Sequence, residues 1–564
     1  MHDSPARSAD HPRGTPDDLP ADATSGRAGG DRRGDLDALR GIAMILVIVV
    51  HACVAYFPVP WPVQDPARAR WLGLVFAAIH GFRMPLFFLL SGFFTMLLFR
   101  RRGLRGLLEQ RALRILLPLI VAMVTILPLT RASIAWAIRR GADAAAARSP
   151  LVGGILAGDV AAVERALAVT TDLSARDPVS GLTPLALAAL GGNGAVVESL
   201  LDAGASPAAT SGDGGTPLHA AAFMGEADVV ELLLARGADP AAGNAAGQTA
   251  LAAVELPVDY ALVAGRFLGL PARDEPAVVV GRARVRDLLA AATPPAARPG
   301  PLESLAASYR RLIGSPTFSI EAAGWRWHLF HDEVFDHLWF LWYLCWLVAV
   351  FALAAAVGLA PTGRRRWWLV PVSSLPFLVM ATPIGPDVAL GLLPAPHLLL
   401  FYGCFFWFGA GTFAAEGVGT PLGRHWKVVL PVSLGLVFPA IIAVLGVQPV
   451  AATLQTAYAW GASLGLIGLF RRFFSGPSWR LRWLADASYW IYLAHLPLVI
   501  ALESLLIDVP WTAVPKFLVV NAVSLAVLLV SYRWCVRYSP IGWLLNGPRS
   551  RAADLSLPAT DHRG

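Results

Sequence analysis

The sequence predicts an all-α protein, in which a polytopic membrane bundle of about ten transmembrane helices carries an inserted solenoid of repeats. Three observations lead to this fold class. Hydrophobic residues make up 56% of the 564 residues and charged residues only 15%, whereas soluble domains are nearer to a quarter charged. Apolar runs long enough to cross a bilayer recur along the chain. One long connection between two such runs has a 33-residue period instead.

Ten apolar runs have the length of membrane-spanning helices. We expect these helices at about residues 36–57, 71–99, 112–130, 337–358, 367–385, 397–415, 428–447, 452–470, 484–507 and 514–536. The fifth run contains Pro371, Pro376 and Pro383, and proline removes a backbone donor from a helix. The membrane domain is therefore predicted in two parts, residues 35–132 with helices 1–3 and residues 325–540 with helices 4–10.

Clusters of arginine and lysine orient these helices, because basic loops of membrane proteins stay in the cytoplasm. The clusters lie at residues 32–33, 100–105, 364–366, 424–427, 471–482 and 537–551. With ten helices all of them fall on one face, so both termini are predicted to be cytoplasmic and the protein to lie in the inner (plasma) membrane. The same clusters account for the net charge of +7, which therefore indicates no nucleic-acid partner.

The two ends of the chain lack apolar runs. Residues 1–34 are rich in Asp, Arg, Pro and Gly, which predicts a disordered cytoplasmic tail. This stretch has no apolar core of a signal peptide, so the first helix is expected to direct insertion. Residues 541–564 are predicted to form a second cytoplasmic tail.

The long connection after the third helix contains sequence repeats. TPLALAA begins at Thr183, TPLHAAA at Thr216 and a shortened copy at Thr249. This period and motif are typical of ankyrin repeats, which bury their Leu and Ala faces against neighbouring repeats. We predict an ankyrin module with cap and linker over residues 149–300, on the extracytoplasmic side, that offers a docking surface to an unknown protein partner. His219 is expected to be structural.

The first predicted helix carries an arginine and a histidine on one face. Arg40 and His51 are eleven positions apart, which is roughly three turns and about 16 Å along a helix. A histidine inside a span is costly and titrates near neutral pH, so His51 is a candidate general base, although a structural hydrogen bond is the alternative. Arg40 is either a positive-inside anchor or part of a site.

Two arginines begin the third predicted helix. Arg111 and Arg114 share a helix face at the cytoplasmic edge of the membrane. Arginine forks suit phosphate groups, but positive-inside anchors would have the same pattern.

Further candidates lie toward the outer side. His80 and Arg83 share a face of the second helix and either line the interface or meet the acceptor substrate. His337 begins the fourth helix, and His495 is a second histidine within a span that either lines a site or is structural.

A metal site is not predicted. The pair His328 and His331 is a weak motif on its own, and an interfacial amphipathic segment is the better explanation. The four cysteines are far apart in apolar runs, which indicates neither disulfides nor metal binding.

Several motifs carry a resemblance to a known family. LDALRGIAMILVIVVH resembles the opening helix of the membrane acyltransferase type 3 family. RMPLFFLLSGFF, RALRILLP, HLWFLWYL and DASYWIYLAHLPL resemble its later motifs in the same order, and HLWFL and AHLPL resemble its glucan succinyltransferase branch. Two features depart from the family. Arg83 stands where related sequences have a histidine or an acidic residue, and the ankyrin module is an addition.

The resemblance implies an integral membrane O-acyltransferase that moves an acyl group from cytoplasmic acyl-CoA to a hydroxyl of an extracytoplasmic glycan or related acceptor. His51 would deprotonate that hydroxyl or carry the acyl group transiently. CoA binding is assigned to Arg40, Arg111 and Arg114, and substrate binding to His337, Arg83 and His495. No bound cofactor is expected, because acyl-CoA is the donor substrate; the other partners are the lipid bilayer and the glycan.

Two other classes of function remain open. A glycan or lipid transporter or flippase would use the same polar residues as a pathway, but the sequence has no clear inverted repeat. An ankyrin-bearing membrane sensor or scaffold without catalysis would not need the Arg40 and His51 pair.

Overall fold

The structure, a computed structural model, describes most of residues 34–547. The residues left out within this range are 58, 60, 171, 246, 257, 294–299, 323–324, 331–333, 362–366, 381–383, 388–390, 418–421, 446 and 477. The predicted tails lie largely outside the described residues. Nearly all regular structure in the described part is helical, which confirms the all-α prediction.

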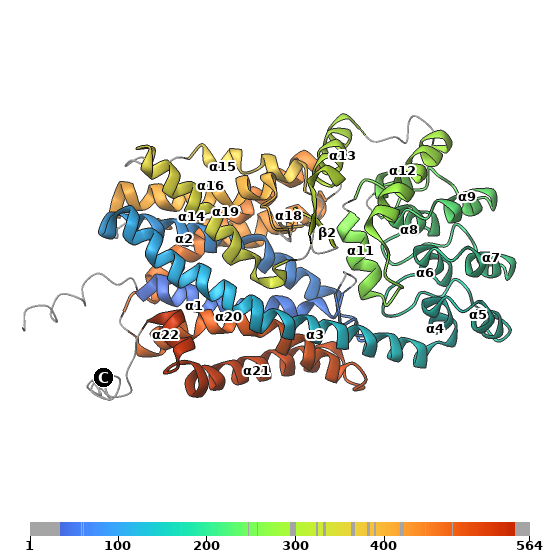
Figure 1. Cartoon of the computed structure of the whole chain (residues 1–564), viewed down its shortest axis with the longest axis horizontal. Coiled ribbons are helices and arrows are strands. Elements are labelled where there is room, and N and C mark those ends of the chain that lie inside the picture. The colour runs from blue at the N-terminus through green and yellow to red at the C-terminus, as the bar shows by residue number, and fades with distance from the viewer. Residues whose placement is uncertain are drawn as a thin grey trace, which may run out of the picture.

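The membrane bundle is built from helices before and after the repeat module (Figure 1). They are α1 (Gly34–Val54), α2 (Arg70–Arg111), α3 (Leu117–Arg148), α14 (Trp339–Ala356), α16 (Pro396–Glu416), α17 (Trp426–Val432), α18 (Phe438–Ala443), α19 (Gln448–Phe473), α20 (Trp479–Leu506), α21 (Ala513–Ser531) and α22 (Pro540–Asn546). Within the described residues, three short π-helical segments lie between neighbouring helices, at η1 (Ala112–Leu116), η7 (Ser433–Val437) and η8 (Tyr532–Val536).

Seven helical segments of the described chain are long and apolar enough to cross a membrane. One of them, residues 70–148, contains both the second and the third predicted span and turns at Gly103, whose φ is +68°. The eighth predicted span is α19, which has 26 residues. A multi-pass bundle is thus confirmed, while the count of ten stays a prediction.

The fifth predicted span is not one continuous helix. Its described part contains only α15 (Leu369–Val372) and the 3-10 helix η5 (Leu375–Leu378). Pro371 and Pro376 lie in these two segments and have no backbone N–H to donate. The regular series of i to i−4 helix hydrogen bonds is therefore interrupted at both residues. The prediction of a continuous helix here was wrong.

Two glycines let α2 and α16 approach each other closely. A Cβ atom built on Gly92 would lie 1.8 Å from the carbonyl oxygen of Phe406, and one built on Gly409 would lie 2.0 Å from that of Leu89. Both distances are far below van der Waals contact. Small residues at these positions therefore set the separation of the two helices.

Gly92→Ala is expected to lower the stability of the purified protein, because α2 and α16 must move apart to admit the methyl group. Overpacking of this kind costs roughly 1–3 kcal/mol. The midpoint of thermal unfolding in detergent measures the effect. Gly141→Ala in α3 is the matched control, since nothing lies within 4 Å of its added Cβ. Equal midpoints for the two variants would contradict the close packing.

The repeat module consists of stacked helix pairs. Its helices are α4 (Pro150–Ala157), α5 (Val160–Leu167), α6 (Pro184–Gly191), α7 (Gly194–Asp202), α8 (Pro217–Met224), α9 (Ala227–Ala235) and α10 (Ala250–Ala253), followed by α11 (Val258–Phe267), α12 (Glu275–Ala292) and α13 (Pro301–Ile313). His219 forms a capping box with Thr216 and its Nε2 lies 2.9 Å from the carbonyl oxygen of Gln248. This confirms its structural role.

One face of the repeats is covered by the chain itself. Leu190 and Met224, from α6 and α8, form one apolar cluster with Ala261 of α11 and with Leu270. Helix α12 packs against α8, α9 and α10 at the end of the stack. Part of the surface expected to dock a protein partner is thus occupied by α11.

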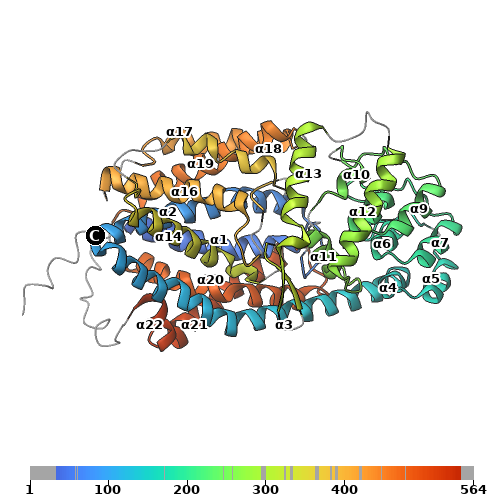
Figure 2. The same ribbon diagram turned by 45° about the horizontal axis from the view of Figure 1, so that its top comes forward.

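The module and the predicted cytoplasmic face lie at opposite ends of the molecule. Figures 1 and 2 show the repeats at one end of the long axis and α22 toward the other. Helix α3 runs from the bundle into α4. A short hairpin of β1 (Ser319–Ala322) and β2 (Trp325–His328), which the sequence did not predict, lies between module and bundle.

Candidate active site

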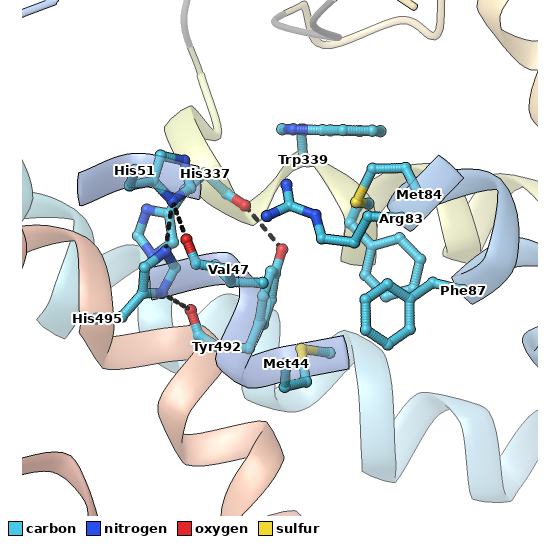
Figure 3. A pocket seen from close by; sticks show the side chains of 11 residues that line it. Met44, Val47, His51, Arg83, Met84, Phe87, His337, Trp339, Tyr492 and His495 are labelled. Carbon is cyan, nitrogen blue, oxygen red and sulfur yellow. Dashed lines mark hydrogen bonds between the residues drawn. The ribbon is translucent and has the colours of Figure 1, made fainter. Parts of the chain in front are cut away.

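Four of the predicted site residues line one pocket in the membrane bundle. His51, Arg83, His337 and His495 come from α1, α2, the 3-10 helix η4 (Asp336–Leu338) and α20 (Figure 3). The space between these side chains, with its opening to the outside included, is about 390 Å³. Its other lining residues are Met44, Val47, Met84, Phe87, Trp339, Phe340 and Tyr492. The wall is thus apolar and aromatic around three imidazoles and one guanidinium.

His51 and His495 contact each other through defined ring nitrogens. Nε2 of His495 lies 3.0 Å from Nδ1 of His51, which is also 3.0 Å from the carbonyl oxygen of Val47. Nδ1 of His495 lies 2.8 Å from the carbonyl oxygen of Tyr492, and a carbonyl only accepts, so this nitrogen carries the proton.

The same network assigns the tautomer of His51. If Nδ1 of His495 is protonated, its Nε2 is a hydrogen-bond acceptor, and Nδ1–H of His51 donates to it and to Val47. Nε2 of His51 then holds a free lone pair. No hydrogen bond reaches this nitrogen within the described part of the chain, so it is free to act as a base in the pocket.

His337 lies beside the other two histidines and completes the group (Figure 3). Its Nε2 donates to the carbonyl oxygen of Leu493 over 2.9 Å, and its ring stands edge-on to His495 with centroids 5.3 Å apart. Nδ1 of His337 is buried without a hydrogen-bond partner among the described residues. The residue before it, Asp336, has a positive φ of 43°, a conformation that non-glycine residues rarely adopt. Such strain often occurs where a functional side chain must be placed.

Arg83 brings a buried positive charge to the pocket. The residue is only 6% exposed, and its Nε and Nη1 have no hydrogen-bond partner within the residues that the structure describes. A buried guanidinium with unused donors is costly unless an anion or a strong acceptor meets it. The site is therefore built to receive negative charge next to the histidines.

The three arginines predicted to bind CoA do not line this pocket. Nη2 of Arg40 donates to the carbonyl oxygen of Ala485 over 3.3 Å and lies 3.5 Å from a carboxylate oxygen of Asp37. Nη2 of Arg111 donates to the hydroxyl of Thr95 over 3.0 Å. The Nε atoms of both arginines are buried without partners in the described chain.

Arg114 is engaged differently from the other two arginines. Its Nη1 donates to the carbonyl oxygens of Trp543 and Leu544, at 2.5 and 2.7 Å, near the end of α22. Cations are favourable at helix C-termini, so this contact favours a structural role. The assignment of CoA phosphates to Arg40, Arg111 and Arg114 stays a prediction.

Sequence reasoning missed one residue beside the histidines. Trp61, in the loop after α1, stacks on the ring of His51, with centroids 5.6 Å apart and planes at 20°. In the sequence, Trp61 stands out only by its position between two prolines near the end of a span.

The structure shows no group of three potential metal ligands among the residues that it describes, and His331 lies outside them.

Comparison with known proteins gives two family matches. A model described as an acyltransferase domain matches residues 33–143 and 291–533, and a model of three ankyrin repeats matches residues 152–244. Curated relatives named glucans biosynthesis protein C are similar over 88 residues. The protein of Salmonella typhi is 36% identical and that of Escherichia coli K12 is 35% identical, over 16% of this chain. The chain spans about a quarter of the length of these relatives, 23%.

Proposed function

Since the chain belongs to the acyltransferase family whose model matches more than half of its length, we propose that it transfers an acyl group from cytoplasmic acyl-CoA to a hydroxyl of an extracytoplasmic glycan or related acceptor. The observation that carries this proposal is the pocket in which, among the described residues, Nε2 of His51 has no hydrogen bond and Nε and Nη1 of the neighbouring Arg83 have no partner. The name of the relatives, glucans biosynthesis protein C, supports a glucan or similar glycan as acceptor.

The proposed chemistry uses a general base and a charge-stabilising donor. Nε2 of His51 takes the proton of the acceptor hydroxyl as its oxygen attacks the thioester carbonyl carbon. The carbonyl oxygen becomes an oxyanion, to which Arg83 donates hydrogen bonds. When the intermediate collapses, the carbon–sulfur bond breaks, and the CoA thiolate takes the proton back from His51. The products are the O-acyl ester and CoA.

His495 and His337 support this step in different ways. His495 accepts the Nδ1–H of His51, which keeps Nε2 unprotonated in the resting state and stabilises the imidazolium that forms during attack. His337 has a free Nδ1 that can accept a hydrogen bond from a substrate hydroxyl.

The donor is proposed to enter from the end of α1 that carries Arg40. Arg40 and His51 lie about 16 Å apart along the helix, which is comparable with the length of a pantetheine arm. Arg40 and Arg111, whose buried Nε atoms have no partner among the described residues, are proposed to bind the CoA phosphates. The thioester would reach His51 while the nucleotide stays at the basic face.

Arg83→Met is expected to lower kcat by about 10²- to 10³-fold, the usual loss when an oxyanion donor is removed. The KM for acyl-CoA should change little, because the lost contact forms mainly in the transition state. Arg83→Lys should retain part of the rate, since the positive charge and N–H donors remain, although without the planar geometry of a guanidinium. Steady-state kinetics in membrane vesicles measure both constants. Wild-type kcat in Arg83→Met would contradict the assigned role.

Mass spectrometry of envelope glycans and lipids tests the function as a whole. Cells that make the wild-type protein are compared with cells that lack the gene or make His51→Ala in equal amounts. An added mass that appears only with the wild-type protein identifies both the acyl group and the acceptor. No difference among the three strains in any envelope fraction would contradict the proposal.

The proposed orientation has a separate test. Both termini and the basic clusters are proposed to be cytoplasmic, and the ankyrin module extracytoplasmic in the inner membrane. Protease added to spheroplasts, whose outer face is accessible, should cleave within residues 149–300. Cleavage of this module only in inverted vesicles would reverse the orientation.

A further inference from the structure

The loop between α1 and α2 brings an aromatic side chain against the proposed base. The indole of Trp61 stacks nearly parallel on the imidazole of His51, and the ring of His495 lies 4.9 Å away at 36°. The terminal torsion of a histidine has a broad energy minimum, so hydrogen bonds at Nδ1 alone leave the ring plane free to rock. Stacking at this distance restricts that motion.

Trp61 is itself held by a buried acid. Its indole N–H donates to Oε2 of Glu503 over 2.9 Å, and Glu503, on α20, is only 2% exposed. Oε1 of the same carboxyl has no hydrogen-bond partner in the described chain. A buried carboxyl with a single partner costs free energy that an apolar residue would not. The one hydrogen bond that the described residues give this carboxyl, from Trp61, is therefore the feature that explains its presence.

The rest of the loop is anchored on both sides of Trp61. The N–H of Asp65 donates to the carbonyl oxygen of Ala55, and the N–H of Ala69 to that of Tyr56, at 3.0 and 2.9 Å. Arg68 donates from Nε to the carbonyl oxygen of Pro178, in a turn of the repeat module, over 3.0 Å. The indole thus lies in a segment fixed by the bundle and by the repeats.

We propose that Trp61 is a positioning residue for His51 and that Glu503 holds Trp61 in place. This proposal rests on the proposed function of His51 as the base. The stacked indole fixes the plane of the imidazole, and with it the direction of the Nε2 lone pair. Misplacing a catalytic group by about 1 Å can cost on the order of 100-fold in rate.

The test compares variants of the full chain in inverted membrane vesicles that contain the native acceptors, with labelled acetyl-CoA and succinyl-CoA as probes. Trp61→Ala is expected to lower kcat about 10- to 100-fold with little change in the KM for acyl-CoA. Trp61→Phe and Glu503→Leu each break the indole hydrogen bond and should lower kcat several-fold. Glu503→Gln keeps an acceptor oxygen and should approach the wild-type rate.

Coupling between the two residues gives the decisive result. If Glu503 acts only through Trp61, the double variant Trp61→Phe/Glu503→Leu should be no slower than the slower single variant. Two results would overturn the proposal. One is a double variant whose loss of kcat equals the product of the two single losses, and the other is an equal loss of kcat in Glu503→Gln and Glu503→Leu. Unfolding midpoints of the purified variants identify any loss of rate that comes from misfolding, and kcat is compared per folded molecule.

The inference and the proposed function fail in distinguishable ways. Wild-type rates in both His51→Ala and Trp61→Ala would contradict the proposed function. An inactive His51→Ala together with a wild-type kcat in Trp61→Ala would overturn the positioning role alone. The rescue by Glu503→Gln separates positioning from a general need for the carboxyl charge.

Discussion

His51→Ala is expected to lower kcat for acyl transfer by about 10²- to 10⁴-fold, the contribution usual for a general base. The loss follows from the geometry of the pocket. His337 has an unpartnered nitrogen there, but this nitrogen belongs to a ring fixed by its own bond to Leu493. His495 points its free nitrogen at His51. Neither can replace Nε2 of His51 without moving, so the remaining rate should be small at every acyl-CoA concentration.

His51→Asn separates the loss of the base from a loss of packing. Asparagine can still donate to the carbonyl oxygen of Val47 from the position of Nδ1, but it has no atom where Nε2 lies. It should therefore be as slow as His51→Ala. Val50→Ala is the matched control, because Val50 is buried in the same helix and does not line the pocket. The assignment of the base would fail if His51→Asn turned over at the wild-type rate.

Much of the candidate site could be predicted because spacing on a helix is a local property. Arg40 and His51 lie on α1 as the eleven-residue step predicts, and intramembrane polar residues are costly enough to stand out in sequence. That His51 meets His495 could not be predicted from the residues themselves. The two are 444 positions apart, and their contact depends on how α1 packs against α20.

Predictions from the sequence failed where the structure depends on a tertiary contact or on local backbone geometry, neither of which the composition of a segment shows. Trp61 lies in a loop, where no periodicity shows which way an indole points, and its partner Glu503 is on a distant helix. The fifth span is apolar enough for a membrane helix, but its prolines interrupt the backbone hydrogen bonds of the helix. The ankyrin period predicted stacked repeats, yet no pattern showed that α11 would cover part of their surface. These failures have two causes. Trp61 and α11 depend on tertiary contacts, and the fifth span depends on backbone donors that proline lacks.

Lys516→Met, in α21, is expected to be strongly destabilising, because Lys516 anchors the loop that carries Trp61. Nζ of Lys516 donates to Oδ2 of Asp65 over 2.7 Å, and the two residues are only 1% and 2% exposed. Removing one partner of a buried ion pair leaves the other charge unpaired and typically costs about 3–5 kcal/mol. The midpoint of thermal unfolding in detergent should fall sharply, and acyl transfer should fall with it, because the loop that holds Trp61 against His51 loses an anchor.

The double variant Asp65→Asn/Lys516→Met should recover most of this loss. Burial raises the pKa of Asp65 above its ordinary value, although hydrogen bonds from Lys516 and from the N–H of Ala67 oppose the shift. The attraction within a buried ion pair often fails to repay the cost of removing both charges from water, so a neutral pair should avoid that cost. The exposed pair of Arg105 and Glu109 has the same 2.7 Å separation, so Arg105→Met is the control, and it should change the midpoint little. If the double variant were as unstable as Lys516→Met, the damage would come from lost packing of the lysine stem. Recovery would instead show that the unpaired charge is what destabilises the loop over His51.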